Sequence, residues 1–130
     1  MSTNHKVLIV DDEPHMRRVA ELSLKKGGFE IVVARNGREA LLLAAQELPA
    51  LIVMDVVMPE MDGLAALKEL KQGPTTANIP VIMLTTRGHT LTRQSAEDSG
   101  AAAYLTKSFS PMQLLVEVRR IISGGGSASA

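Results

Sequence analysis

The chain has 130 residues, no cysteine, 14 basic and 14 acidic side chains, and a formal net charge of zero. This length predicts one compact domain, because a chain of this size buries roughly two-thirds of its unfolded surface on folding. The balanced charge and the 2% aromatic content argue against binding to nucleic acid or to an anionic membrane, and the absence of cysteine excludes disulfides and thiolate metal sites.

Five short apolar runs predict the strands of a parallel sheet. Each run is mostly continuous rather than alternating, which is typical of strands covered on both faces. The runs are Val7–Val10, Ile31–Ala34, Leu51–Met54, Val81–Leu84 and Ala102–Leu105.

Segments with helical spacing follow these runs. They cover Pro14–Lys26, Arg38–Glu47, the residues after a predicted N-cap at Asp62, Thr92–Ser99 and Pro111–Ile122. Strand and helix thus alternate five times, which predicts an α/β fold with helices on both faces of a parallel sheet. The predicted domain covers residues 1–122, and the Gly/Ser/Ala-rich residues 123–130 are expected to form a flexible tail.

Polar residues follow the predicted strands at one edge of the sheet. They are Asp11-Asp12-Glu13, Asp55, Thr85-Thr86 and Thr106-Lys107. Ligands of open parallel sheets bind beyond the carboxyl ends of the strands, where these side chains would converge. Hard oxygen ligands suit Mg²⁺, so the sequence predicts a magnesium site at this edge.

Each residue also has an interpretation without a ligand. Asp11 or Asp12 could cap the helix that follows and interact favourably with its dipole. Asp55 alone could solvate a loop, and Thr85 or Lys107 alone would be unremarkable on a surface. Their combination favours a site, because separate strands deliver all of them to one edge.

No competing signature is visible. The sequence has no phosphate-binding loop, no dinucleotide fingerprint and no Gly-x-Ser-x-Gly motif. His5, His15 and His89 lack metal-ligand spacing and are predicted to face solvent.

Four strings of residues at the strand ends share their order and spacing with one protein family. They are Val10-Asp11-Asp12-Glu13-Pro14, the stretch Met54-Asp55-Val56-Val57-Met58-Pro59-Glu60-Met61-Asp62-Gly63, Leu84-Thr85-Thr86, and Tyr104-Leu105-Thr106-Lys107. Over residues 5–122 the chain resembles the receiver domain of response regulators in two-component signalling. The resemblance implies a flavodoxin-like (βα)5 fold with sheet order 2-1-3-4-5.

The resemblance also implies roles for individual residues. Asp55 would accept a phosphoryl group from the phosphohistidine of a sensor histidine kinase or phosphotransfer protein. Mg²⁺ would bind Asp12, Asp55 and the backbone carbonyl of Val57. Asp11 would hold a metal-bound water, and Lys107 would pair with a phosphoryl oxygen.

The chemistry of phosphoryl transfer supports these roles. A carboxylate that attacks phosphorus brings negative charge toward negative charge, so a metal ion and a cation are needed to offset it. The product is a labile acyl phosphate, which suits a resettable switch. The resemblance implies that Thr85 and Tyr104 form that switch.

Two features depart from the family pattern or vary within it. Lys107-Ser108 stands where receivers commonly have Lys-Pro with a cis bond, and a cis bond before serine costs about 2.5–4 kcal/mol. We therefore predict a trans bond, with Lys107 reaching the acidic cluster through its flexible side chain. Val57 and Arg87 occupy positions thought to tune the access of water; Arg87 is expected in solvent, with contact to the phosphate as the alternative.

The signalling face implied by the resemblance is the fourth helix, fifth strand and fifth helix. Met112 and Val116 lie off the buried stripe of the last helix, so with Tyr104 they could form a docking patch for an effector. Scattered exposed apolar residues are common, and this remains the alternative. The Ala101-Ala102-Ala103 stretch lacks acidic residues for symmetric dimers, which favours a monomer of the single-domain chemotaxis type.

Two other function classes remain open. One is a Mg²⁺-dependent phosphohydrolase with an aspartyl-phosphate intermediate, although the haloacid dehalogenase family has Asp-x-Asp rather than adjacent Asp11-Asp12, and a cap domain. The other is a pseudo-receiver that only binds partners. With no apolar run near the ~20 residues of a membrane span and no visible signal peptide, a cytoplasmic location is expected.

Overall fold

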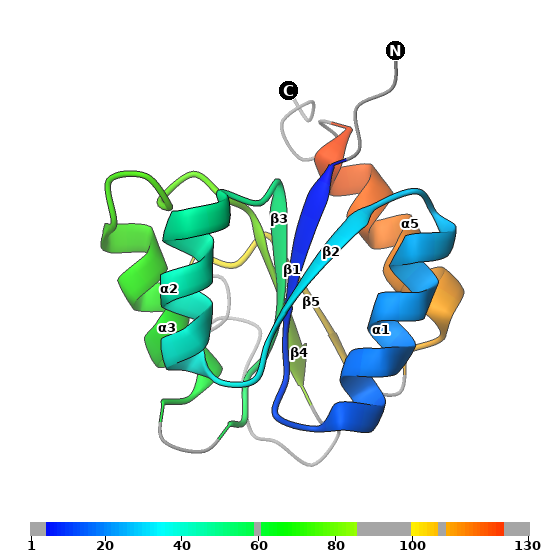
Figure 1. The fold of residues 1–130 in the computed structure, drawn as a ribbon, viewed down its shortest axis with the longest axis horizontal. Helices are drawn as coiled ribbons and strands as arrows, with labels where there is room; N and C mark the ends of the chain where they lie inside the picture. Colours follow the sequence, from blue (N-terminus) through cyan, green and yellow to red (C-terminus); the bar gives the residue numbers. More distant parts are fainter. Residues whose placement is uncertain (1–4, 59–60, 86–99, 107–108, 124–130) are drawn as a thin grey trace.

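Figure 1 shows the computed structural model, which describes residues 5–58, 61–85, 100–106 and 109–123. Five parallel strands form one sheet in the order β2-β1-β3-β4-β5, so the predicted order is confirmed. The strands are β1 (Lys6–Val10), β2 (Glu30–Ala34), β3 (Leu51–Asp55), β4 (Val81–Thr85) and β5 (Ala103–Thr106).

Four described helices cover the two faces of this sheet. They are α1 (Pro14–Lys26), α2 (Gly37–Glu47), α3 (Gly63–Gln72) and α5 (Pro111–Ile122). Helices α2 and α3 lie on one face, and α1 and α5 on the other (Figure 1). The predicted helix at 92–99 and most of the predicted tail lie outside the described residues.

Alternate residues of the central strands enter two separate cores, as expected for strands buried on both faces. The core under α2 and α3 includes Leu8, Val10, Ile52, Met54 and Met83. The core under α1 and α5 includes Val7, Ile9, Val53, Ile82 and Leu84. All ten side chains are at most 2% exposed, so the sheet is a rigid platform for the residues that follow it.

Side-chain caps fix the start of three helices. The Asn36 carboxamide oxygen accepts a hydrogen bond at the start of α2, and the Asp62 carboxylate accepts one at the start of α3, each at 2.8 Å. Ser110 and Gln113 form a reciprocal capping box at the start of α5. The Asp62 cap confirms the sequence prediction.

A partly buried lysine fixes the segment that leads into β4. The Lys71 ammonium donates hydrogen bonds to the carbonyl oxygens of Ala77 (3.1 Å) and Ile79 (2.9 Å). Burial lowers the pKa of Lys71, because it disfavours the charged form. The strand that ends at Thr85 is therefore anchored at its entry. Within the described ranges, no helix has the length and apolar character that a membrane span requires.

Candidate metal centre

The backbone of β1 carries Asp11 and Asp12 to the carboxyl edge of the sheet. The strand ends at Val10, and the Asp11 N–H donates a hydrogen bond to the Ala34 carbonyl at 3.2 Å, so Asp11 continues the pairing with β2. Asp11 is only 1% exposed, whereas its neighbour Asp12 is exposed. The two adjacent carboxylates therefore occupy different environments.

Asp55 is the last residue of β3, the strand beside β1 in the sheet. It is 2% exposed, and its Oδ1 atom accepts a hydrogen bond from the Val57 N–H at 3.2 Å. The Val56 N–H donates to the Leu84 carbonyl at 2.9 Å, which keeps the chain aligned with β4 just past the strand end. Asp55 is thus a buried carboxylate that accepts a backbone hydrogen bond, and the chain that follows it is tied to β4.

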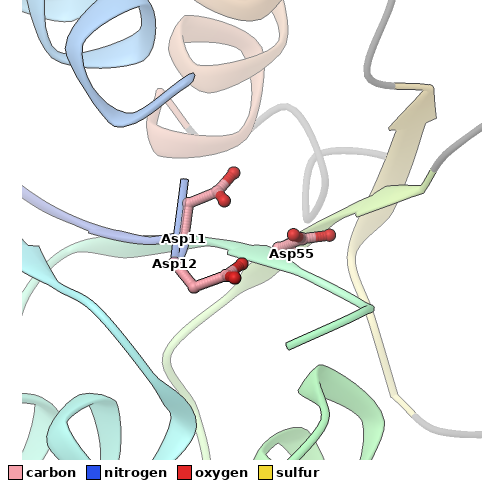
Figure 2. A group of neighbouring side chains, drawn as sticks. All are labelled: Asp11, Asp12 and Asp55. Carbon is pink, nitrogen blue, oxygen red and sulfur yellow. The ribbon is translucent and has the colours of Figure 1, made fainter. Parts of the chain in front are cut away.

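The three carboxylates form one cluster. Each of Asp11, Asp12 and Asp55 offers an oxygen atom, and these atoms lie within 4.8 Å of one another. Figure 2 shows Asp11 and Asp12 leaving the end of β1 in different directions, with the Asp12 carboxylate extended toward Asp55. Three negative charges this close repel one another, and carboxylate oxygens are the ligands that Mg²⁺ prefers. The donor set therefore fits a hard divalent cation.

The segment between β1 and α1 shows that helix capping does not explain the acidic pair. The N-cap of α1 is Glu13, and its side chain makes no capping hydrogen bond. Asp11 instead accepts the Glu13 N–H through Oδ1 at 2.9 Å, which shapes the turn after β1. Neither Asp11 nor Asp12 is therefore the N-cap of α1, which contradicts the capping part of the alternative interpretation.

Arg17 is a residue of the site that could not be identified from the sequence. Its guanidinium Nη1 donates a hydrogen bond to the Asp11 carbonyl oxygen at 2.9 Å, from the first turn of α1 back to the end of β1. A contact between a long side chain and a backbone atom six residues away does not change the spacing of apolar residues in the sequence. Only the position of Arg17 one turn after an acidic pair could have suggested it.

Gly63 belongs to the motif after Asp55, and the structure gives a reason for it that the sequence does not show. A Cβ atom at this position would overlap the Asp55 carbonyl oxygen and lie 2.9 Å from the Val56 Cα. The Gly63 N–H donates to the Val56 carbonyl at 2.7 Å, so α3 begins directly against the end of β3. Glycine is required here for close backbone approach.

The remaining predicted site residues divide into two groups. Thr85 ends β4, partly exposed and paired in register with Thr106, and the Val57 side chain is 48% exposed beside the cluster. Tyr104 packs partly buried against the core under α2 and α3. The residues outside the described ranges are Thr86, Arg87, His89, Lys107 and Ser108, so the predictions for Lys107 and the trans bond remain untested.

The family of this chain follows from its match to a protein-family model. Residues 7–119 match the model of the response regulator receiver domain. The chain belongs to this family. The receiver domain is 40% identical over 117 residues to the probable transcriptional regulator ycf27 of Pyropia yezoensis, covering 90% of this chain and 47% of that protein.

Other similar proteins support the same family. The transcriptional regulatory protein SrrA of Staphylococcus aureus is 38% identical over 119 residues, covering 92% of this chain and 48% of SrrA. The structure of the chemotaxis response regulator CheY4 of Vibrio cholerae matches with a TM-score of 0.85 and 34% identity, covering 92% of this chain and 99% of CheY4. This receiver domain thus spans about half the length of the curated relatives it matches.

Proposed function

We propose that this receiver domain is a phosphoacceptor switch in which Asp55 takes a phosphoryl group from a sensor histidine kinase or phosphotransfer protein. The observation that carries the proposal is the burial of Asp55 within a cluster of three carboxylates at the carboxyl edge of the sheet. A structural role alone does not account for this cluster, because its charges repel and neither Asp11 nor Asp12 is the N-cap of α1.

Mg²⁺ would be held by the carboxylates of Asp12 and Asp55 and by the backbone carbonyl of Val57, with Asp11 acting through a bound water. When bound, the ion would offset the negative charge that builds up as phosphate approaches a carboxylate. The chemistry of the donor set supports this assignment.

The chain itself positions the nucleophile. In the transfer, an Asp55 carboxylate oxygen forms a bond to phosphorus, while the bond between phosphorus and the donor histidine nitrogen breaks. The Val57 N–H orients the carboxylate through Oδ1, and burial of Asp55 limits the access of water to the acyl phosphate. Lys107, outside the described residues, is proposed to pair with a phosphoryl oxygen.

Signal output would involve the edge of the sheet formed by β4 and β5. Thr85 at the end of β4 would hydrogen-bond a phosphoryl oxygen, and partly buried Tyr104 would change its packing in step. We also propose that the chain acts as a cytoplasmic monomer and binds no nucleic acid or membrane directly.

A hollow on α5 would receive the effector. It has a volume of about 230 Å³ and is lined by Leu105, Met112, Gln113, Val116 and Glu117. Of the three predicted docking residues, Met112 and Val116 line the hollow and are 65% and 52% exposed, whereas Tyr104 is not among its lining residues. Apolar and accessible side chains beside Gln113 and Glu117 support the docking hypothesis.

The experiment that tests the function is intact-mass analysis after incubation with acetyl phosphate and Mg²⁺. The wild-type chain should gain one phosphoryl group, and Asp55→Asn should gain none, because the amide is nearly isosteric but a poor nucleophile. Asp62→Asn is the matched control, since asparagine still caps α3 and labelling should persist. Stoichiometric labelling of Asp55→Asn would overturn the proposal, and steady release of inorganic phosphate from small esters would favour the phosphohydrolase alternative.

A further inference from the structure

Arg17 lies at a position from which it controls the backbone that carries the acidic pair. Its backbone N–H donates to the Glu13 carbonyl at 3.1 Å, and its guanidinium donates to the Asp11 carbonyl at 2.9 Å. A single residue therefore joins both ends of the segment Asp11-Asp12-Glu13 to the first turn of α1. The Glu13 N–H closes the segment internally by donating to Asp11 Oδ1.

This arrangement matters most for Asp12. Asp11 and Asp55 are buried, but Asp12 is exposed. Within the described part of the chain, no hydrogen bond or ion pair is recorded for the Asp12 carboxylate, so its position depends on the backbone beneath it. The Arg17 bond to the residue before Asp12 restrains that backbone directly.

We propose that Arg17 is a positioning residue for the metal centre: its guanidinium, through the Asp11 carbonyl, holds the Asp12 carboxylate where a divalent cation bound to the cluster needs it. The inference rests on the proposed function of the cluster. Among the described residues, the Arg17 guanidinium forms no ion pair with the three carboxylates, so its effect passes through the backbone. Partners that orient ligands in this way commonly set metal affinity without touching the metal.

The test compares Arg17→Gln with Arg18→Gln. Arg18 is the next residue on α1, is exposed, and its replacement changes the net charge by the same amount. Calorimetric titration with MgCl₂ should show binding about tenfold weaker in Arg17→Gln and within twofold of wild type in Arg18→Gln. The amide resonance of Glu13, which reports the turn, should move only in Arg17→Gln.

Two outcomes would overturn the proposal. Equal weakening in both variants would mean that long-range charge, and not positioning, sets the affinity. A lower melting temperature in Arg17→Gln with wild-type Mg²⁺ affinity would reduce Arg17 to a structural contact. Failure of the proposed function can be told apart from failure of the Arg17 proposal, because the wild-type chain itself would then show no saturable Mg²⁺ binding.

A second variant keeps the test decisive if Arg17→Gln does not fold. Arg17→Lys keeps the charge but lacks the planar fork and has a shorter reach to the Asp11 carbonyl. Weaker Mg²⁺ binding by folded Arg17→Lys supports the need for the guanidinium. Wild-type affinity in that variant would contradict it.

Discussion

The carboxyl edge of β1 and β3 differs from the outer side of α5 in how far its side chains are buried. At the edge, Asp11 and Asp55 are almost completely buried and are held by backbone hydrogen bonds. On α5, Met112 and Val116 are more than half exposed. One region is fixed before any ligand arrives, and the other leaves its side chains free to adapt.

The difference suits the two parts of the switch proposed above. Phosphoryl transfer needs reacting groups held in one geometry, which rigid strands supply. Recognition of an effector needs an accessible apolar surface that can repack around a partner. Substitutions that disturb the buried groups of the edge should therefore alter stability and metal binding together, whereas substitutions on the outer side of α5 should alter neither.

The largest effect on stability is expected from Gly63→Ala. The added methyl group would overlap the Asp55 carbonyl oxygen, so α3 and the end of β3 must separate. Forced overpacking of this kind costs about 3 kcal/mol, which chemical denaturation should detect as a lower transition midpoint. Mg²⁺ binding should weaken in parallel, because Asp55 moves with its backbone.

The control for Gly63→Ala is Gly28→Ala. Gly28 has a φ of +92°, but no atom lies within 4 Å of its would-be Cβ. This variant should therefore lose only about 1–2 kcal/mol through backbone strain and keep its Mg²⁺ affinity. Equal loss of Mg²⁺ binding in both variants would contradict the link between Gly63 and the site.

The next effect in size is the loss of metal-linked stabilisation in Asp12→Ala. At a Mg²⁺ concentration about 100-fold above the dissociation constant, binding stabilises the wild-type fold by about 2.7 kcal/mol. Removing the exposed Asp12 carboxylate should abolish most of the Mg²⁺-dependent rise in melting temperature without lowering the melting temperature of the metal-free protein. Glu69→Ala, an exposed acidic residue on α3, should keep the full shift; an undiminished shift in Asp12→Ala would place the metal elsewhere.

These residues also show what could be read from the sequence. Asp11, Asp12 and Asp55 could be predicted because Asp11-Asp12 and Asp55 come straight after buried apolar runs, and the parallel topology then brings strand ends together. The limits of α1 and α5 were predicted correctly because glycine, proline and polar residues mark them. Strand β3 extends one residue further, to Asp55, because backbone pairing continues where apolar side chains stop.

The structural supports of the site could not be read in the same way. Arg17 and Gly63 act through contacts with backbone atoms of Asp11 and Asp55, and such contacts depend on the relative placement of helix and strand. Local propensity and periodicity carry no information about that placement. The sequence therefore predicts the reacting groups better than the residues that hold them.

A smaller effect is expected where α5 joins α1. The buried Ser23 hydroxyl donates to the Pro111 carbonyl at 2.8 Å, so it anchors the start of α5 against α1. Ser23→Ala removes this bond and should cost about 1 kcal/mol in denaturant unfolding. Ser123→Ala removes an exposed hydroxyl at the end of α5 and should lower the free energy of unfolding by less. An equal loss in both variants would show that the buried Ser23 hydrogen bond stabilises the fold no more than an exposed one.

The smallest effect on stability is expected from the double replacement of Met112 and Val116 by glutamine. Both side chains are mainly exposed, and glutamine is a good helix former, so the free energy of unfolding should change by less than about 0.5 kcal/mol. Phosphoryl uptake should also be unchanged, because neither residue belongs to the acidic cluster.

Titration of the phosphorylated chain with its effector should nevertheless show at least about tenfold weaker binding, equivalent to about 1.4 kcal/mol, because the apolar hollow on α5 is lost. Leu42→Gln removes a side chain that is 66% exposed on α2, on the other face of the sheet, and should leave effector binding intact. If Leu42→Gln weakened binding as much as the α5 replacement, the effector would recognise exposed apolar surface in general, and α5 would lose its proposed role as the adaptable counterpart of the rigid acidic edge.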